Sequence, residues 1–415
     1  MKLLESQKNY NAQNRPAGRS INKQSLSSIT NALRWAALFV LLVIGACEEK
    51  LPTLQTDETP LEFETITISA DSLFIQRTIE PSLGKSDILF IGNDEDVYAY
   101  TLMKFANLSA LPDTLDSLIS VSLNLQTYHQ FQSAVTENQS IDISISQLNN
   151  NGDDPWTEDS TNVNNFDVNN YDLKLLRSHT FSENDTTLEI PLETGLVAGW
   201  HDSSNTDYTL VLQQEGINLS GIQAIYSKDG TYYPWLEVKH LEDGDTSIIK
   251  IIPSEDLSIL TFKKEPSSSN SYISSGRSSY SYLKFDLKND FHDKNVVIAK
   301  AYLHLTIDTV QSQLYGENFH LYLNFLDSAL LADQNYNPLY EVYDQYYPVG
   351  STDSVAVIDI KKLIQGVVSE YIDNYGIVIW APPTVLNIST FSFYNPSQNP
   401  VNIRPYLEIL TMKEQ

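Results

Sequence analysis

The chain has 415 residues and is strongly acidic, since 53 Asp and Glu against 26 Lys and Arg give a formal net charge of −27. Such a surface repels polyanions, which argues against nucleic acid and anionic lipid headgroups as partners. A single cysteine excludes an intrachain disulfide and a cysteine metal cluster.

The N-terminal segment resembles a processing signal. Residues 35–46 are mostly apolar and too few to span a bilayer comfortably. They lead into the sequence IGAC, which resembles the bacterial lipobox, where small residues precede the cysteine that carries the lipid. We therefore expect residues 1–46 to be a lipoprotein signal peptide and Cys47 to be lipidated, because several acyl chains make a stable anchor. Removing the peptide, which holds six basic side chains and one acidic one, changes the formal charge from −27 to −32.

The polar segment 47–60, with two prolines, predicts a lipidated tether. The expected location is the bacterial cell envelope, as an outer-membrane lipoprotein that contacts the membrane through its lipid alone. Exposure at the cell surface stays open.

Almost everything after residue 61 predicts β-structure. Short runs such as 140–146, 208–213 and 301–308 alternate apolar and polar residues and are rich in β-branched and aromatic side chains. The fold class that these runs predict is all-β: two tandem jelly-roll-like antiparallel β-sandwich domains, each with one short helix.

Internal repetition indicates a duplicated domain. Five blocks recur in the same order: 104–105 with 284–285, 122–127 with 302–307, 195–200 with 362–367, 207–212 with 374–379, and 234–238 with 405–409. This period is too long for a solenoid. We place copy A at 61–241 and copy B at 247–412.

The helical pattern falls at the same place in both copies. Residues 359–368 have apolar side chains at i, i+3 and i+4 spacing, with Asp359 as a possible N-cap. The first matched block places a lysine, Lys104 or Lys284, before a phenylalanine in each copy. Its recurrence favours an architectural role, in which the stem lies over apolar neighbours and the ammonium lies near an acid or a carbonyl.

Taken in order, the blocks resemble the extracellular bacterial domains named DNRLRE, a group of carbohydrate-binding modules. The resemblance rests on 80–93, on the L-x-K-F strands, on Trp156-Thr157-Glu158 with the Asn-rich turn 162–167, and on the P-x-L-E strands. Copy A departs from the pattern at Ala106, and copy B has a tyrosine-rich segment, 336–348, where the W-x-E motif would lie. The resemblance implies a jelly-roll-like sandwich with a non-catalytic role outside the cell.

Aromatic residues are the candidate ligand contacts, because a flat apolar ring can pack against a sugar. The candidates are Trp156, Tyr232, Tyr233, Tyr336, Tyr340, Tyr343, Tyr346 and Tyr347. Trp200 and Trp235 occupy repeated motif positions and are expected in the core. Calcium is a possible structural cofactor, since two oxygen-rich stretches could supply its ligands. The acids concerned are Asp94, Asp96, Asp153 and Asp154, although the same residues are common in ordinary turns.

The histidines are scattered, and the sequence has no HExxH motif, phosphate loop or GxSxG elbow. We therefore expect a lipid-anchored, non-catalytic binding module, with polysaccharide as the favoured ligand. Two alternatives stay open: a structural or adhesive surface protein with a protein partner, and a polysaccharide-active hydrolase or lyase.

Overall fold

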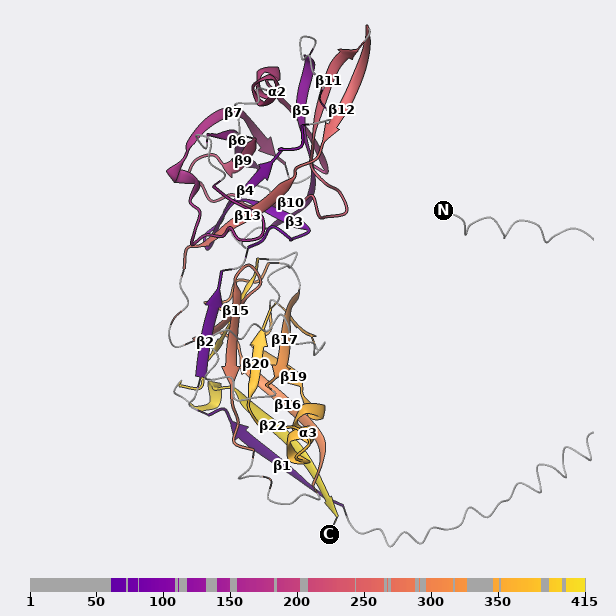
Figure 1. Ribbon diagram of the computed structural model, residues 1–415. Coiled ribbons are helices and arrows are strands. Elements are labelled where there is room, and N and C mark those ends of the chain that lie inside the picture. The colour runs from indigo at the N-terminus through magenta and orange to yellow at the C-terminus, as the bar shows by residue number, and fades with distance from the viewer. Residues whose placement is uncertain are drawn as a thin grey trace, which may run out of the picture. The chain divides into compact units, whose positions relative to one another are not determined.

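Strands dominate the computed structural model (Figure 1). The structure describes residues 61–414 with these exceptions: 72–73, 81, 109–110, 112–117, 132–139, 150–154, 183–184, 202–207, 243, 265–266, 268–269, 288–290, 292–295, 316–317, 327–345, 351, 382–387 and 398–400. In that part of the chain, the predicted all-β antiparallel sandwich is confirmed, with two α-helices beside the sheets. None of the helices described there is long and apolar enough to cross a membrane. The predicted signal peptide, Cys47 and the tether lie outside the described residues.

The largest sheet has 11 strands and holds most of the N-terminal half. In order of pairing they are β12 (Asp245–Ile251), β11 (Trp235–Glu242), β5 (Leu118–Phe131), β10 (Gly221–Tyr226), β3 (Ile88–Asn93), β4 (Val97–Lys104), β9 (Thr209–Gln214), β6 (Ile141–Asn149) and β7 (Asp172–Phe181), with β13 (Glu255–Phe262) on β4 and β8 (Thr187–Leu192) on β5. Leu123, Ile143 and Leu212, from three of these strands, share one core with Trp200. The sheet therefore curls over its own apolar face.

Three smaller sheets make up the C-terminal half. The first pairs β1 (Leu61–Ser69), β22 (Tyr406–Glu414), β16 (Val297–Thr306) and β19 (Val355–Asp359); the second pairs β18 (Tyr346–Gly350), β17 (Asn318–Phe325), β20 (Ile377–Trp380), β15 (Ser278–Leu283) and β2 (Phe74–Ile79); the third pairs β14 (Asn270–Ser274) and β21 (Thr390–Tyr394). They enclose a second core that includes Leu303, Ile379 and Phe391.

The strand pairing crosses the predicted copy boundaries at both ends. β1 and β2, which the repeats assign to copy A, pair with β22 and β15 of the C-terminal sheets. The Thr411 hydroxyl donates to the Glu64 carbonyl at 3.2 Å, which ties β22 to β1. β13, which the repeats assign to copy B, pairs with β4 along eight residues. Residues Glu62–Lys413 belong to one compact unit.

Both helices lie where the repeated pattern predicts them. α2 spans Thr194–His201 and α3 spans Lys361–Val368, with Ile364 of α3 fully buried. Asp359 does not occupy the N-cap position itself, which belongs to Ile360, but its carboxylate accepts a 2.9 Å hydrogen bond from the Lys361 N–H. Single 3₁₀ turns occur at Val168–Asn170 and Val401–Ile403.

β3 and β4 explain how one lysine of the repeat becomes buried. Successive side chains of a strand point to opposite faces, and both faces of these strands are covered. On β4, Met103 and the following Phe105 enter the core of the large sheet, whereas Tyr100 and Leu102 enter a separate cluster with Trp156. Lys104 has the same parity as Leu102 and therefore faces Trp156.

Candidate functional site

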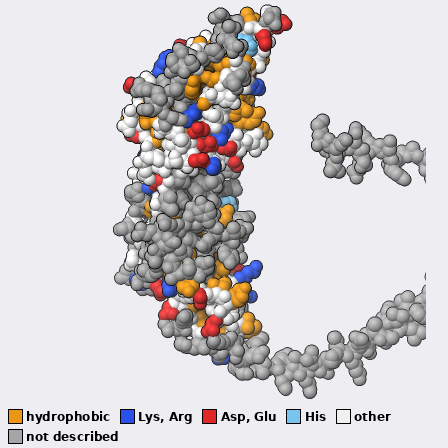
Figure 2. Space-filling view, viewed as in Figure 1, with side chains coloured by type: hydrophobic (Ala, Val, Ile, Leu, Met, Phe, Trp, Pro, Cys, Tyr) orange, Lys and Arg blue, Asp and Glu red, His pale blue; other side chains and the backbone are white. Residues whose placement is uncertain are grey.

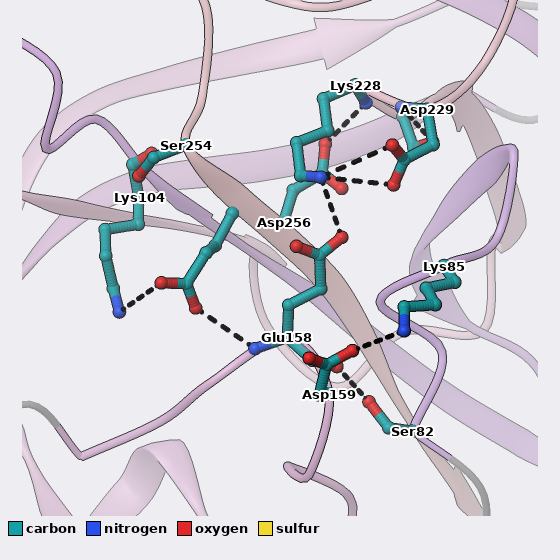
Figure 3. Close-up of polar contacts among 11 residues, drawn as sticks. Ser82, Lys85, Lys104, Glu158, Asp159, Lys228, Asp229, Ser254 and Asp256 are labelled. Carbon is teal, nitrogen blue, oxygen red and sulfur yellow. Dashed lines mark hydrogen bonds and ion pairs between the residues drawn. The ribbon is translucent and has the colours of Figure 1, made fainter.

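Three loops and the start of β13 meet beside the large sheet (Figure 3). The loops are 82–87 before β3, 156–161 between β6 and β7, and 227–234 between β10 and β11. Figure 2 shows basic and acidic side chains gathered over the region where Figure 1 places β10 and β13. These loops and the start of β13 therefore carry the charged side chains of the candidate site.

Four side chains form what we call the carboxylate cluster: Glu158, Lys228, Asp229 and Asp256. The Lys228 ammonium lies 2.9 Å from Glu158 Oε1 and 3.2 Å from Asp229 Oδ2. The Lys228 backbone N–H donates to Asp256 Oδ2 at 2.7 Å. One oxygen from each of the three carboxylates lies within 4.8 Å of the others. Two carboxylates thus contact the Lys228 ammonium, and the third contacts the backbone N–H of the same lysine.

Burial sets the electrostatics of the cluster. Asp256 is fully buried, and this burial raises its pKa to about 7, although the Lys228 N–H opposes the shift. Burial alone would lower the pKa of Lys228, but hydrogen bonds to Glu158 and Asp229 outweigh burial, so its pKa is raised. The ammonium is therefore charged throughout the physiological range.

Close backbone approach holds the Glu158 loop in place. A Cβ built on Gly84 would overlap the Glu158 backbone, and the Ser82 hydroxyl donates to the Glu158 carbonyl. At the periphery, Lys85 and Asp159 form a 2.8 Å ion pair that is largely exposed. The pKa of Asp159 is lowered by its hydrogen bond to Lys85.

Gly84→Ala is expected to lower the free energy of unfolding by about 1–3 kcal/mol, because the added methyl forces the two loops apart. Gly195→Ala is the matched control, since a Cβ there meets no atom within 4 Å and alanine is the better helix former. Urea denaturation of both variants would measure the difference. Equal stability of the two variants would contradict the close approach of the loops.

Lys104 and Trp156 stabilise the loop that carries Glu158. The Lys104 ammonium lies 4.6 Å from the centroid of the Trp156 ring, and it donates to the Trp156 carbonyl at 3.2 Å and to Glu255 Oε1 at 3.3 Å. Glu255 Oε2 also accepts the Glu158 N–H at 3.1 Å. The prediction that this ammonium lies near an acid or a carbonyl is confirmed for copy A. In copy B, Lys284 is half-buried between the buried Leu283 and Phe285.

Trp156 is itself a core residue. Its side chain is 2% exposed, and its indole N–H donates to Thr209 Oγ1 at 3.1 Å. The ring is covered by Lys104 and has no free face for a sugar, so we do not carry Trp156 into the candidate binding surface. Trp200, expected in the core, is 1% exposed.

Tyr232 and Tyr233 are exposed as a ligand contact requires. Their exposed fractions are 49% and 44%, and both follow Lys228 and Asp229 on the 227–234 loop. Neighbouring rings extend the surface edge to face, at centroid distances of 5.5 Å (Tyr128–Tyr226), 5.2 Å (Tyr226–Tyr232) and 6.5 Å (Tyr233–Trp235). Tyr128, Tyr226 and Tyr232 thus form one group of rings and Tyr233 and Trp235 another, and we call the five rings the aromatic strip. Trp235, expected in the core, is only half-buried, under the Lys250 ammonium at 4.4 Å.

Five tyrosines of copy B are also predicted ligand contacts. Tyr336, Tyr340 and Tyr343 lie outside the described residues. Tyr346 and Tyr347 lie on β18, where their backbones pair with Tyr322 and Leu321 of β17.

Asp94 and Asp96, predicted as calcium ligands, are held by protein groups. The Asp94 carboxylate accepts hydrogen bonds from the Glu95 N–H at 2.7 Å and from the Tyr315 hydroxyl at 2.6 Å. Asp96 pairs with the Lys264 ammonium at 2.5 Å. We therefore do not carry either acid into a metal site. Asp153 and Asp154 lie outside the described residues.

Sequence reasoning missed the carboxylate cluster as a unit. Glu158 belongs to the W-x-E motif, whereas the Lys228-Asp229-Gly230 turn belongs to no motif named above. Asp256 lies in the segment that the repeats assign to copy B, and only the pairing of β13 with β4 brings it to Glu158. The sequence signal for the cluster is a pair of adjacent charged residues in each of two loops: Glu158-Asp159 and Lys228-Asp229.

The cluster is poorly arranged for glycoside hydrolysis. A pKa of about 7 suits a general acid, but Asp256 is 0% exposed and is covered by the 227–234 loop. A glycosidase needs both carboxyl groups to reach the scissile bond. The arrangement suits charge compensation or cation binding better than proton transfer to a sugar.

No family model matches the chain, and no curated protein matches it. The resemblance to DNRLRE domains stays a prediction.

Proposed function

We propose that the protein is a lipid-anchored envelope protein that binds polysaccharide without cleaving it. The observation that carries the proposal is the aromatic strip, with Tyr232 and Tyr233 about half exposed on one loop. A sugar ring packs its apolar face on an aromatic ring, while its hydroxyls bond to nearby polar groups. Asp229, with 41% of its side chain exposed, supplies such a group on the same loop.

The position of the strip supports binding rather than core packing alone. Tyr128 lies on β5 and is 40% exposed, and Tyr226 packs edge-on between it and Tyr232. Edge-to-face contacts fix the orientation of each ring, so little side-chain freedom is lost when a ligand binds. A row of fixed rings can contact successive sugar units of an extended chain.

Tyr232→Ala with Tyr233→Ala is expected to weaken binding at least tenfold, because two stacking surfaces are removed at once, and tenfold corresponds to about 1.4 kcal/mol. Affinity gel electrophoresis of the full-length chain in mild detergent, across neutral and anionic polysaccharides, would measure the change. Tyr371→Ala is the matched control, since Tyr371 is 88% exposed on the C-terminal half.

Two results would contradict the proposal. Lack of retardation by every polysaccharide would overturn sugar binding, and equal retardation of the double variant would overturn the assignment to the strip. Release of oligosaccharides from the same polymers would indicate a hydrolase or lyase instead.

A protein partner is the second candidate, and one observation favours it. Leu241 of β11 and Ile248 of β12 are 47% and 53% exposed, and the pairing Lys239↔Ile248 places them on one face of the hairpin. Clustered exposed apolar side chains are typical of interaction surfaces. A stoichiometric envelope protein recovered with the wild-type chain, and lost with Ile248→Asp, would favour this candidate over polysaccharide.

A further inference from the structure

We propose that the carboxylate cluster binds a divalent cation of the calcium class, with Glu158, Asp229 and Asp256 as its protein ligands. The inference goes beyond polysaccharide binding and does not depend on it.

The geometry of the three carboxylates fits one cation. Calcium lies about 2.3–2.6 Å from each oxygen ligand, so two oxygens on the same ion are at most about 5 Å apart. The three acids each offer one oxygen within 4.8 Å of the others. The three oxygens are therefore close enough to share a single ion after small shifts of the side chains. Calcium accepts water for its remaining positions.

Asp256 provides a second, independent observation. Its side chain is 0% exposed, and its Oδ2 accepts the Lys228 N–H. Its Oδ1 is buried and has no hydrogen-bond partner among the described residues. A buried carboxylate oxygen without a donor is unfavourable, and Figure 3 shows the carboxylate directed toward the Lys228 ammonium and Glu158. A cation in the cluster would give this oxygen its missing partner.

Charge balance also favours a divalent ion. With all groups ionised, three carboxylates and one ammonium leave a net charge of −2. Lys228 bridges Glu158 and Asp229 but makes no side-chain hydrogen bond to Asp256. Its ammonium thus stands near the position that a cation would take, and the two compete. Lys228 is 18% exposed and Asp229 41% exposed, so the cation would enter from the side of the 227–234 loop.

The backbone holds two of the ligands rigidly. Glu158 is fixed by Gly84, by Ser82 and by its N–H bond to Glu255. Asp256 pairs with Met103 within the β13–β4 ladder. A site whose ligands are already in place loses little entropy on binding.

Isothermal titration calorimetry with calcium chloride alone would test the proposal on the full-length chain in mild detergent, after EDTA treatment and at constant ionic strength. One site per chain is expected. Asp256→Asn and Glu158→Gln should each weaken it at least tenfold, whereas Lys228→Met should strengthen it by removing the competing ammonium. Circular dichroism would verify that each variant is folded.

Asp172→Asn is the control for general attraction of cations to an acidic surface, because it removes one exposed carboxylate at the start of β7. Unchanged calcium affinity in this control supports the site. Equal affinities of Asp172→Asn, Asp256→Asn and Glu158→Gln, or the absence of a saturable site in the wild-type chain, would overturn the proposal. Because sugar is absent, failure here leaves the polysaccharide test unaffected.

Discussion

Asp256→Asn is expected to stabilise the metal-free chain at pH 8 and to change its stability little near pH 4. The folded chain holds Asp256 with a pKa of about 7, against an ordinary value of 3.8. Between these values the folded state keeps a proton that the unfolded state releases. The contribution of Asp256 to the free energy of unfolding therefore falls as the pH rises from about 4 to 7, and stays low above 7.

The size of the change in the free energy of unfolding follows from the change in the pKa of Asp256. Each pKa unit corresponds to about 1.4 kcal/mol, so the loss approaches about 4 kcal/mol as an upper bound. Asparagine has the same shape, keeps an acceptor for the Lys228 N–H, and carries no charge to bury. The free energy of unfolding of Asp256→Asn, relative to that of the wild type, should therefore rise steadily from about pH 4 to pH 7.

Urea denaturation in EDTA at pH 4.5, 6 and 8 would measure the free energy of unfolding of the wild type and of Asp256→Asn. Taking the difference between the two chains cancels the titration of the groups that they share. Asp172→Asn, which removes an exposed carboxylate, is the control variant for the same measurement. A variant that is less stable than the wild type at pH 8 in EDTA would show that the charged form of Asp256 is well solvated or well paired.

Trp156→Ala is expected to lower the free energy of unfolding by about 3–5 kcal/mol, the range for removing a large buried aromatic side chain. The ring is 2% exposed and packs in a cluster with Leu102, Phe166 and Val211. Its loss also removes the aromatic face beneath the Lys104 ammonium and leaves Thr209 without the indole donor.

Trp156→Phe separates these contributions. Phenylalanine keeps an aromatic face but lacks the indole N–H, so its loss of stability should be clearly smaller than that of alanine. Thermal and urea unfolding of both variants would provide the measurement. A loss below about 1 kcal/mol for Trp156→Ala would show that the ring is not a core element, and would return it to the list of candidate sugar contacts.

The sequence was sufficient for the local features of the fold. Alternating apolar residues predicted strands, and the i, i+3, i+4 pattern predicted α3, because both patterns reflect which face of an element is buried. The continuous apolar run of β3 has the same cause, since Ile88 and Phe90 enter one core and Leu89 and Ile91 enter another.

Pairing partners could not be predicted in this way. A strand pattern specifies which side chains are buried and leaves open which neighbour covers them, so the repeats suggested that each copy pairs within itself. β1, β2 and β13 instead pair with the other half. For this reason the sequence alone does not bring Asp256 to Glu158. It also does not show that Lys104, 52 residues away, covers the Trp156 ring.

The pairing of β1 has a mechanical consequence. If Cys47 is anchored as proposed, a pull on the bound ligand is transmitted through the chain to residue 61, where β1 begins. β1 is paired to β22, the last strand of the chain. Tension between the ligand and the anchor would therefore pass from the sheet that carries the aromatic strip through the C-terminal sheet that holds β1. With that anchor, the C-terminal half would be the mechanical base of the N-terminal half.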